Sequence, residues 1–315
     1  KKSCPLCGSS KTKLNGLYVN GRQRYYCEAC RHSFSLHNKG VKISNEFIWF
    51  KEWLCEGYTV SQLSRISKKS ERKIRLIIDY WLHHSPWQSD DHLARTKYLV
   101  FDGSFIWKRR TSAVILLDAE TNKLVYGLYD FKENSFRALL DLFQGLRMAG
   151  VSPRSCTVDG LPAVIKALAD VWPDIIIQRC LFHIQRQGLK WCRSYPKTAE
   201  ARKLRSLFLS MMNISTFEER DNFLLSVKEW EANYGCRIKD RPERGRVFSD
   251  LKRARSMLLN ALPNAFHYLQ DVRIAKTTNL AEGYFSFMKT RYRDHRGLSS
   301  LKRKAFFDWF FYLKK

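Results

Sequence analysis

The stretch that most constrains the fold of this 315-residue chain runs from residue 154 to 183. It opens with a short β-prone run, residues 155–158, that ends on Asp159. Pro162 stands where the first turn of a helix tolerates proline, and apolar residues recur after it at helical spacing. Residues 174–177, in which three isoleucines follow Asp174, then predict a strand buried on both faces. The order strand, helix, strand predicts a parallel pair of strands.

Asp159 is the first candidate site residue. A carboxylate just past the carboxyl end of a parallel strand lies where open α/β sheets place their ligands. The second strand delivers Cys180 and His183 to the same edge of the sheet. The alternative is that Asp159 only caps the following helix.

The charge balance predicts a polyanionic partner. The chain has 56 Lys and Arg against 30 Asp and Glu, a formal net charge of +26, and this excess most simply indicates nucleic acid. A membrane surface is the competing polyanion, but the longest purely aliphatic run, residues 113–117, is far too short to span a bilayer. No signal peptide is visible, so we expect a cytoplasmic, nucleoid-associated protein.

Two CxxC pairs predict a structural zinc site in the N-terminal region: Cys4 with Cys7, and Cys27 with Cys30. Two thiolates on a tight turn bind one side of a tetrahedral Zn²⁺, and the second pair completes the site. Glycines divide the intervening segment into predicted hairpin strands at residues 17–19 and 24–26. A disulfide or a redox pair is the alternative, and His32 and His37 are interpreted as surface residues.

Residues 44–84 show helical periodicity, with Gly57 ending a first helix and a capping-box pattern at Thr59 opening a second. A third helix follows, with an apolar face and an outer face of cations: Arg72, Lys73 and Arg75. This order predicts a helix-turn-helix whose third helix reads DNA. Any small three-helix packing unit is the alternative.

The central segment predicts a catalytic core. Residues 98–102 form a strand that ends on Asp102, and strands at 112–117 and 123–129 and a helix at 134–148 follow. Three antiparallel strands, a helix, a parallel strand, a helix and a fifth strand is the order of the ribonuclease H-like fold. In that order the ends of the first and fourth strands are adjacent, so we expect Asp102 and Asp159 to lie close together.

Two neighbouring carboxylates repel each other unless a cation binds them, so this pair implies Mg²⁺ or Mn²⁺. Two-metal phosphoryl transfer uses about three such acids. Glu282 is the candidate third acid, near the start of a helix that carries Lys289 two turns later. The alternative is that Glu282 only interacts with the helix dipole.

Other charged residues surround this assignment. Cations follow Lys289 along the same segment and suit a phosphate backbone: Arg291, Arg293 and Arg296. Five rival acids are interpreted as solvated or structural: Asp118, Asp130, Glu218, Glu219 and Glu243. Helical periodicity at residues 197–212, 217–234 and 247–262 predicts an all-helical insertion before Glu282.

Four short motifs together resemble the DDE transposases of the Mutator-like superfamily, in the bacterial insertion-sequence branch that carries an N-terminal zinc ribbon: Phe101-Asp102-Gly103, Val158-Asp159-Gly160, Cys180-Leu181-Phe182-His183 and Thr278-Asn279-Leu280-Ala281-Glu282-Gly283. The resemblance implies an α/β ribonuclease H-like core interrupted by a helical insertion. It implies that Asp102, Asp159 and Glu282 bind the metal ions. Lys289 would then contact DNA near the cleaved phosphate, and His183 would lie close to the site.

The resemblance implies metal-dependent cleavage at transposon ends and transfer of the freed 3′-hydroxyl into target DNA, by a homodimer or a larger synaptic assembly. A non-catalytic DNA-binding regulator and a nuclease without strand transfer are the alternatives. A zinc hydrolase is disfavoured, because no open three-ligand site with a base is visible. The expected domains are a zinc ribbon, a helix-turn-helix, the first part of the core, the insertion and the C-terminal part of the core: residues 1–40, 41–90, 91–193, 194–272 and 273–315.

Overall fold

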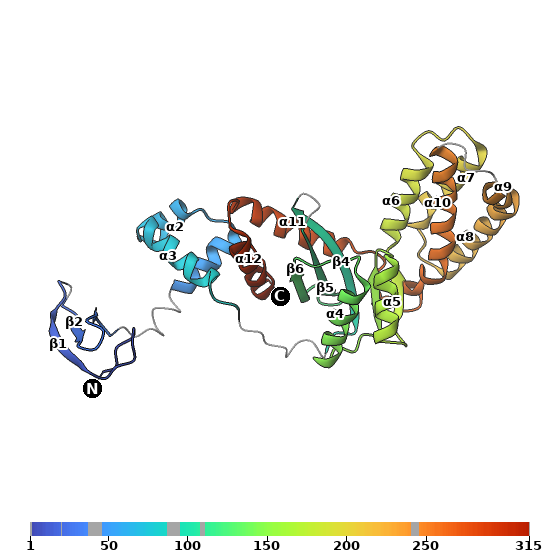
Figure 1. Cartoon of the computed structure of the whole chain (residues 1–315). Coiled ribbons are helices and arrows are strands. Elements are labelled where there is room, and N and C mark those ends of the chain that lie inside the picture. The colour runs from blue at the N-terminus through green and yellow to red at the C-terminus, as the bar shows by residue number, and fades with distance from the viewer. Residues whose placement is uncertain are drawn as a thin grey trace.

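The computed structural model describes residues 2–19, 21–36, 46–86, 95–107, 111–240 and 246–314 (Figure 1). A small sheet and a helical segment come first along the chain. A larger sheet with helices on both faces follows, and a helical bundle is inserted before the last two helices. His37 and Glu243 lie outside the described residues.

The N-terminal sheet contains β1 (Thr12–Leu17), β2 (Gln23–Cys27) and β3 (Ser33–Phe34), antiparallel in that order. The second predicted strand is confirmed, but the first is wrong by several residues. Gly16, with φ +69°, lies at a shift of register inside β1 and does not break the strand. A bulge accommodates one such residue without ending the pairing, so β1 continues to Leu17.

The helical segment begins at residue 46 and continues into the π-helical turn η1 (Glu52–Glu56), which ends at Gly57 with φ +77°. Two helices follow, α2 (Val60–Ser67) and α3 (Glu71–Leu82). Thr59 and Gln62 form the predicted capping box of α2, and the Ser70 side chain accepts from the Lys73 backbone N–H at the start of α3. The predicted succession of three helices is confirmed.

The central sheet is mixed and has the strand order β6-β5-β4-β7-β8. Its strands are β4 (Tyr98–Trp107), β5 (Thr111–Asp118), β6 (Leu124–Tyr129), β7 (Ser155–Val158) and β8 (Ile176–Arg179). The first three are antiparallel neighbours, and β7 and β8 run parallel to β4. β8 begins two residues later than predicted, because the backbone N–H of Ile175 donates to the carbonyl of Trp172 in a turn.

Alternating side chains along β4 separate the two faces of this sheet. Leu99 and Phe101 face α4 (Phe136–Met148) and α5 (Pro162–Val171), with which they share one buried cluster. Val100 belongs to a second cluster on the opposite face, formed with α11 (Asn279–Asp294) and α12 (Ser300–Leu313). The sheet is therefore covered on both sides (Figure 1).

The inserted helices form a bundle with its own core. They are α6 (Leu181–Cys192), α7 (Ala199–Met211), α8 (Phe217–Trp230), the π-helical turn η3 (Glu231–Gly235), α9 (Cys236–Asp240) and α10 (Arg246–Ala261). α6 packs against α7 and α10, so this core begins before residue 194. Among the described residues, no helix combines the length and apolar character needed to cross a membrane.

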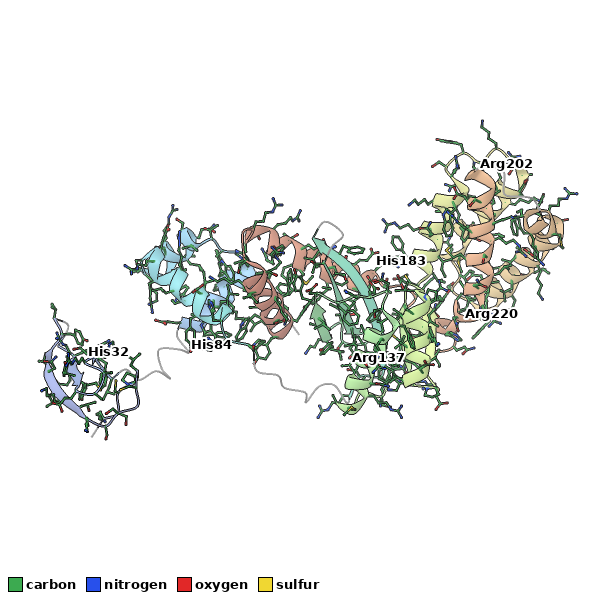
Figure 2. All side chains as sticks on the ribbon, viewed as in Figure 1. His32, His84, Arg137, His183, Arg202 and Arg220 are labelled. Atoms are coloured by element: carbon green, nitrogen blue, oxygen red, sulfur yellow. The ribbon has the colours of Figure 1, made fainter. Side chains whose placement is uncertain are left out.

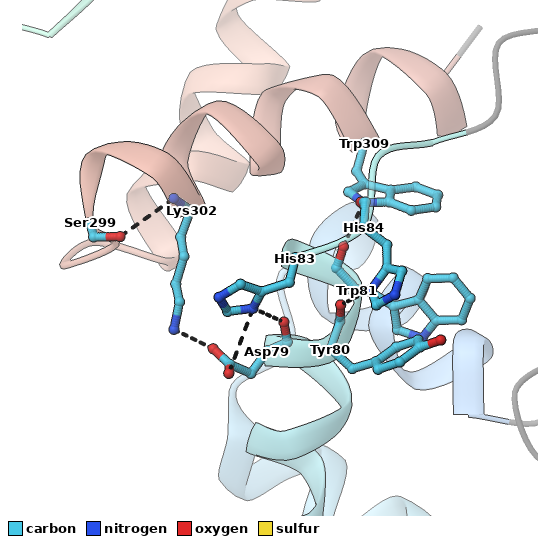
Figure 3. A network of polar contacts seen from close by, with 8 residues as sticks. All are labelled: Asp79, Tyr80, Trp81, His83, His84, Ser299, Lys302 and Trp309. Carbon is cyan, nitrogen blue, oxygen red and sulfur yellow. Dashed lines mark hydrogen bonds and ion pairs between the residues drawn. The ribbon is translucent and has the colours of Figure 1, made fainter. Parts of the chain in front are cut away.

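Trp309 of α12 connects the helical segment to the C-terminal helices. Its indole N–H donates to the carbonyl oxygens of Trp81 and His84 at 2.8 and 2.7 Å (Figure 3). Its ring is 1% exposed and lies edge-on to Phe50 and Trp81. Nearby, Lys302 forms an ion pair with Asp79. The helical segment and the last helix therefore share one core with one face of the sheet.

We expect Trp309→Phe to lower the free energy of unfolding by about 1–2 kcal/mol, because the smaller ring leaves a void and the indole hydrogen bonds are lost. Chemical denaturation followed by circular dichroism measures this change. Leu301→Ala, on the same helix but exposed, is the control and should leave the midpoint unchanged. An unchanged midpoint for Trp309→Phe would contradict a structural role for this contact.

Candidate functional site

The four cysteines of the two CxxC pairs come together as predicted. Their sulfur atoms all lie within 4.8 Å of one another, and Cys4 is 3.6 Å from Cys30, as Cys7 is from Cys27. Tetrahedral Zn²⁺ with Zn–S bonds of about 2.3 Å requires S–S separations of roughly 3.8 Å, far longer than a disulfide bond. The cluster could therefore hold a structural metal ion, and no histidine of the described chain belongs to it.

The backbone prepares this arrangement. Gly8 follows the first CxxC pair with φ +73°, and its N–H donates to the Cys4 carbonyl. Arg31 stands at the equivalent place after the second pair and also adopts a positive φ, +57°. Both turns therefore have the left-handed corner that lets two sulfurs of one pair point to the same side.

A second candidate site lies at the central sheet, where Asp102 and Asp159 are level with each other. In the register of β4 with β7, Val100 pairs with Thr157, and each aspartate follows two residues later. The prediction that the first and fourth strands of the core are neighbours is confirmed. Side chains two residues apart in a strand share a face, so Asp102 faces the same side as Val100, toward α11.

Glu282 reaches the same place from the first turn of α11. Thr278, which is fully buried, precedes this helix. The segment before it is attached to the sheet, because the Thr157 hydroxyl donates to the carbonyl of Ala275 at 2.7 Å. β7 therefore leads directly to Asp159 and also anchors the segment that precedes α11, the helix that carries Glu282.

These three acids line one cavity of about 440 Å³. It is also lined by His183, Arg186 and Lys289. Figure 2 shows His183 where α6 begins, between the central sheet and the bundle. The cavity is therefore an acidic patch bordered by cations, with contributions from the sheet, α6 and α11.

Asp102 is the most buried of these acids, with 7% of its surface exposed. Burial raises the pKa of its carboxyl to about 7, His183 opposes this shift, and Asp159 and Glu282 add to it. Asp159 is half-buried, and one of its oxygens accepts from the backbone N–H of Leu161 at 3.0 Å. The alternative that Asp159 caps the following helix is wrong, because the N-cap residue of α5 is Leu161 and this helix has no side-chain cap.

His183 joins a small polar network at the start of α6. Its Nδ1 lies 3.3 Å from the Cys180 sulfur, which also accepts from the backbone N–H of Thr278 at 3.3 Å. Burial opposes ionisation of Cys180, but its contacts with His183 and Thr278 lower its pKa on balance. The Cys180 contact raises the pKa of His183 to about 9 against the effect of burial. Nε2 of His183 lies 3.5 Å from Glu282, so the network orients an imidazolium toward that acid.

The predicted DNA-contacting cations of α11 separate into two groups. Lys289 lines the cavity and donates to the Ser104 hydroxyl at 2.6 Å. Arg291 lies instead against the helical segment, beside Gly57, and Arg293 and Arg296 are exposed beyond the cavity. Of this predicted set, only Lys289 reaches the acids.

Two of the three predicted DNA-reading cations of α3 form ion pairs within the chain. Lys73 forms an ion pair with Glu46 at 2.8 Å, and Arg75 with Glu71 at 2.8 Å. Arg72 is exposed. The role of this helix in reading DNA stays a prediction.

Sequence reasoning missed Glu133 and Arg186. Arg186 stands one helical turn after His183 in α6, so helical spacing after the Cys180–His183 motif could have identified it. Glu133 lies in the connection between β6 and α4, where no periodicity predicts a direction for its side chain. Burial, followed by the charges of Asp159 and Asp102, raises the pKa of Glu133 to about 7.

This shift predicts a pH-dependent stability. An acid whose pKa is raised by folding carries no penalty where it is protonated in both states, near pH 4, and destabilises the folded chain as the pH rises toward 7. Without added divalent cations, Glu133→Gln and the wild type should therefore melt together at pH 4. The variant should melt about 2–5 °C higher at pH 8. Equal melting temperatures of the variant and the wild type at both pH values, measured by calorimetry, would contradict an unpaired Glu133 that is partly removed from water.

Comparisons with known proteins add no relative. A scan of protein-family models finds none that matches this chain, and a search of curated proteins finds no significant match.

Proposed function

We propose that this chain is a DNA transposase of an insertion sequence that cleaves transposon ends and transfers the 3′-hydroxyl to target DNA. The observation that carries the proposal is the convergence of Asp102, Asp159 and Glu282 on one cavity bordered by cations. These acids come from a strand, a strand end and a distant helix, so local structure alone gives no reason for them to meet.

The architecture supports this proposal. Three antiparallel strands followed by two parallel ones, in the order β6-β5-β4-β7-β8, is the arrangement of a ribonuclease H-like sheet. In open α/β sheets, ligands bind outside the carboxyl ends of strands where the connections change direction. The aspartates lie at such a place, between β4 and β7.

The donor set fits divalent cations. Carboxylate oxygens are the ligands that Mg²⁺ and Mn²⁺ prefer, and Asp102 has a raised pKa, as expected for a buried acid that has two other acids beside it. Among the described residues, only the four cysteines form a group of three or more such ligands with all ligand atoms within 4.8 Å of one another, so the three acids do not form one. Like charges repel, which accounts for acids that share a cavity without closer approach.

Asp102, Asp159 and Glu282 would hold the metal ions. Ions held there would supply activation of the attacking oxygen and stabilisation of the leaving oxygen of a phosphodiester. Lys289 and Arg186 would orient the phosphate by charge. His183, held by Cys180 and Thr278, keeps Glu282 directed into the cavity at 3.5 Å.

The remaining parts suit the handling of long DNA ends. The net charge of +26 favours a polyanion, and the N-terminal cysteine cluster and the helices of residues 46–82 are the proposed end-binding parts. Since two ends must be processed together, we expect a homodimer or a larger synaptic assembly.

The test uses DNA that spans both flanks of the gene, incubated with the purified full chain and Mg²⁺. Strand breaks at inverted terminal repeats, followed by joined products, are the expected result. Breaks without joined products would favour the nuclease alternative. Specific binding without any break would favour a non-catalytic regulator and overturn the proposal.

A further inference from the structure

Glu133 is held in place although it lies in a loop. Phe131, two residues before Glu133, is 8% exposed and belongs to the cluster between the sheet and α4. Its backbone N–H donates to the Ser112 carbonyl at 3.1 Å. On the other side, the backbone N–H of Ser135 donates to the Lys132 carbonyl at 3.0 Å, and the Ser135 side chain caps α4. The loop is therefore anchored on both sides of Glu133.

The carboxylate of Glu133 lies against Gly103, the residue after Asp102. A Cβ atom at position 103 would lie 2.0 Å from Oε2 and 2.6 Å from Oε1 of Glu133. Because side chains alternate along a strand, this Cβ would point away from Asp102, toward the α4 side of the sheet. Glu133 thus approaches β4 from the face opposite α11, through the space that the missing side chain leaves.

No described residue neutralises this acid. The described side chains include no ion-pair or hydrogen-bond partner for Glu133, and the charges that influence it most are those of Asp159 and Asp102. Asp102 is itself more than nine-tenths buried and lines the cavity. Carboxylates so far removed from water, one buried and one half-buried, are costly to ionise, and a bound cation reduces that cost.

We propose that Glu133 supplies a fourth carboxylate to the divalent-cation site of Asp102 and Asp159, and that Gly103 is required because any side chain there displaces it. This inference rests on the proposed function, since it assumes a cation at the two aspartates. Glu133 binds from the α4 side of the sheet, and the three acids of the cavity bind from the α11 side. The cation is then held by oxygens from both faces of β4.

Binding of Mn²⁺ to the full, zinc-loaded chain tests the inference without any catalytic assay, since free Mn²⁺ is measured directly by electron paramagnetic resonance. Loss of even an outer partner of a metal site costs about 10–100-fold in affinity. We therefore expect Glu133→Gln to weaken Mn²⁺ binding at least about tenfold. The exposed Glu120→Gln is the matched control and should bind as the wild type does.

Gly103→Ala provides a second, independent variant. Its methyl group should move the flexible Glu133 carboxylate rather than the backbone, and it should weaken Mn²⁺ binding as Glu133→Gln does. Adding it to Glu133→Gln should produce little further loss, because both changes remove the same ligand. Two fully additive losses would contradict this shared cause.

Asp102→Asn distinguishes a failure of the role of Glu133 from a failure of the whole cation site. If it abolishes Mn²⁺ binding and Glu133→Gln leaves binding unchanged, the cation site stands and the role of Glu133 is overturned. If neither variant changes Mn²⁺ binding, no cation binds at the aspartates. Both the inference and the metal-dependent function then fail.

Discussion

Replacing any one of Asp102, Asp159 and Glu282 with its amide is expected to lower Mg²⁺-dependent strand cleavage by at least about 100-fold, since one preorganised charged group at a reacting phosphate contributes about this much. An amide keeps the shape of the side chain but removes the negative charge that holds a cation. Binding to transposon-end DNA should persist or strengthen, because the change makes the cavity less negative.

Gel-based cleavage assays and binding measurements on the same DNA check this expectation. Asp118→Asn is the matched control, because Asp118 accepts hydrogen bonds from Glu120 and Thr121 in a turn and does not line the cavity. It should cleave at the wild-type rate. A substituted Asp102, Asp159 or Glu282 that retains cleavage would remove that residue from the catalytic set.

The position of the two aspartates could be predicted from the sequence for physical reasons. Residues 98–101 are a continuous apolar run and residues 155–158 are a β-prone run, and each of these runs is followed by an acid. Once the order of strands is inferred, β4 and β7 must be neighbours, and the observed register puts Asp102 level with Asp159. The residue pattern and the strand order were therefore sufficient to predict that the two aspartates are neighbours, without any side-chain contact.

Other features depend on contacts that no pattern contains. Glu133 lies in the connection between β6 and α4. Its carboxylate lies against Gly103 of β4, thirty residues earlier in the chain. The cations of α3 were predicted to lie on an outer face, but Lys73 forms an ion pair with Glu46 at the start of the preceding helical segment. Such interactions between segments far apart in the sequence become visible only when the chain is folded.

Contacts between distant segments also explain why the ends of some elements were predicted wrongly. Gly16 is compatible with a turn or with a bulge, and only pairing with β2 decides between them. α6 carries the Cys180–His183 motif at its start, yet the rest of it packs with α7 and α10. One helix thus belongs to the candidate site at its first turn and to the bundle core beyond it.

Loss of the N-terminal metal should have a large and local effect. In Cys27→Ser we expect the zinc content to fall and this part of the chain to unfold, because the buried core of its described residues, 2–19 and 21–36, consists only of Cys4, Cys27 and Phe34. Structural zinc contributes roughly 10–16 kcal/mol in small zinc-binding modules, far more than so small a core supplies. Binding to transposon ends should weaken with it.

The buried clusters of the central sheet and the bundle include no residue of the N-terminal part. The temperature of their unfolding transition should therefore not change. Elemental analysis, amide hydrogen exchange of residues 2–36 and calorimetry together check these expectations. Cys236→Ser, an exposed thiol outside the cluster, is the matched control and should change none of them. Unchanged zinc content in Cys27→Ser would exclude the tetrahedral site. Unfolding that spreads to the central sheet would show that the N-terminal part is coupled to a core with which it shares no buried cluster.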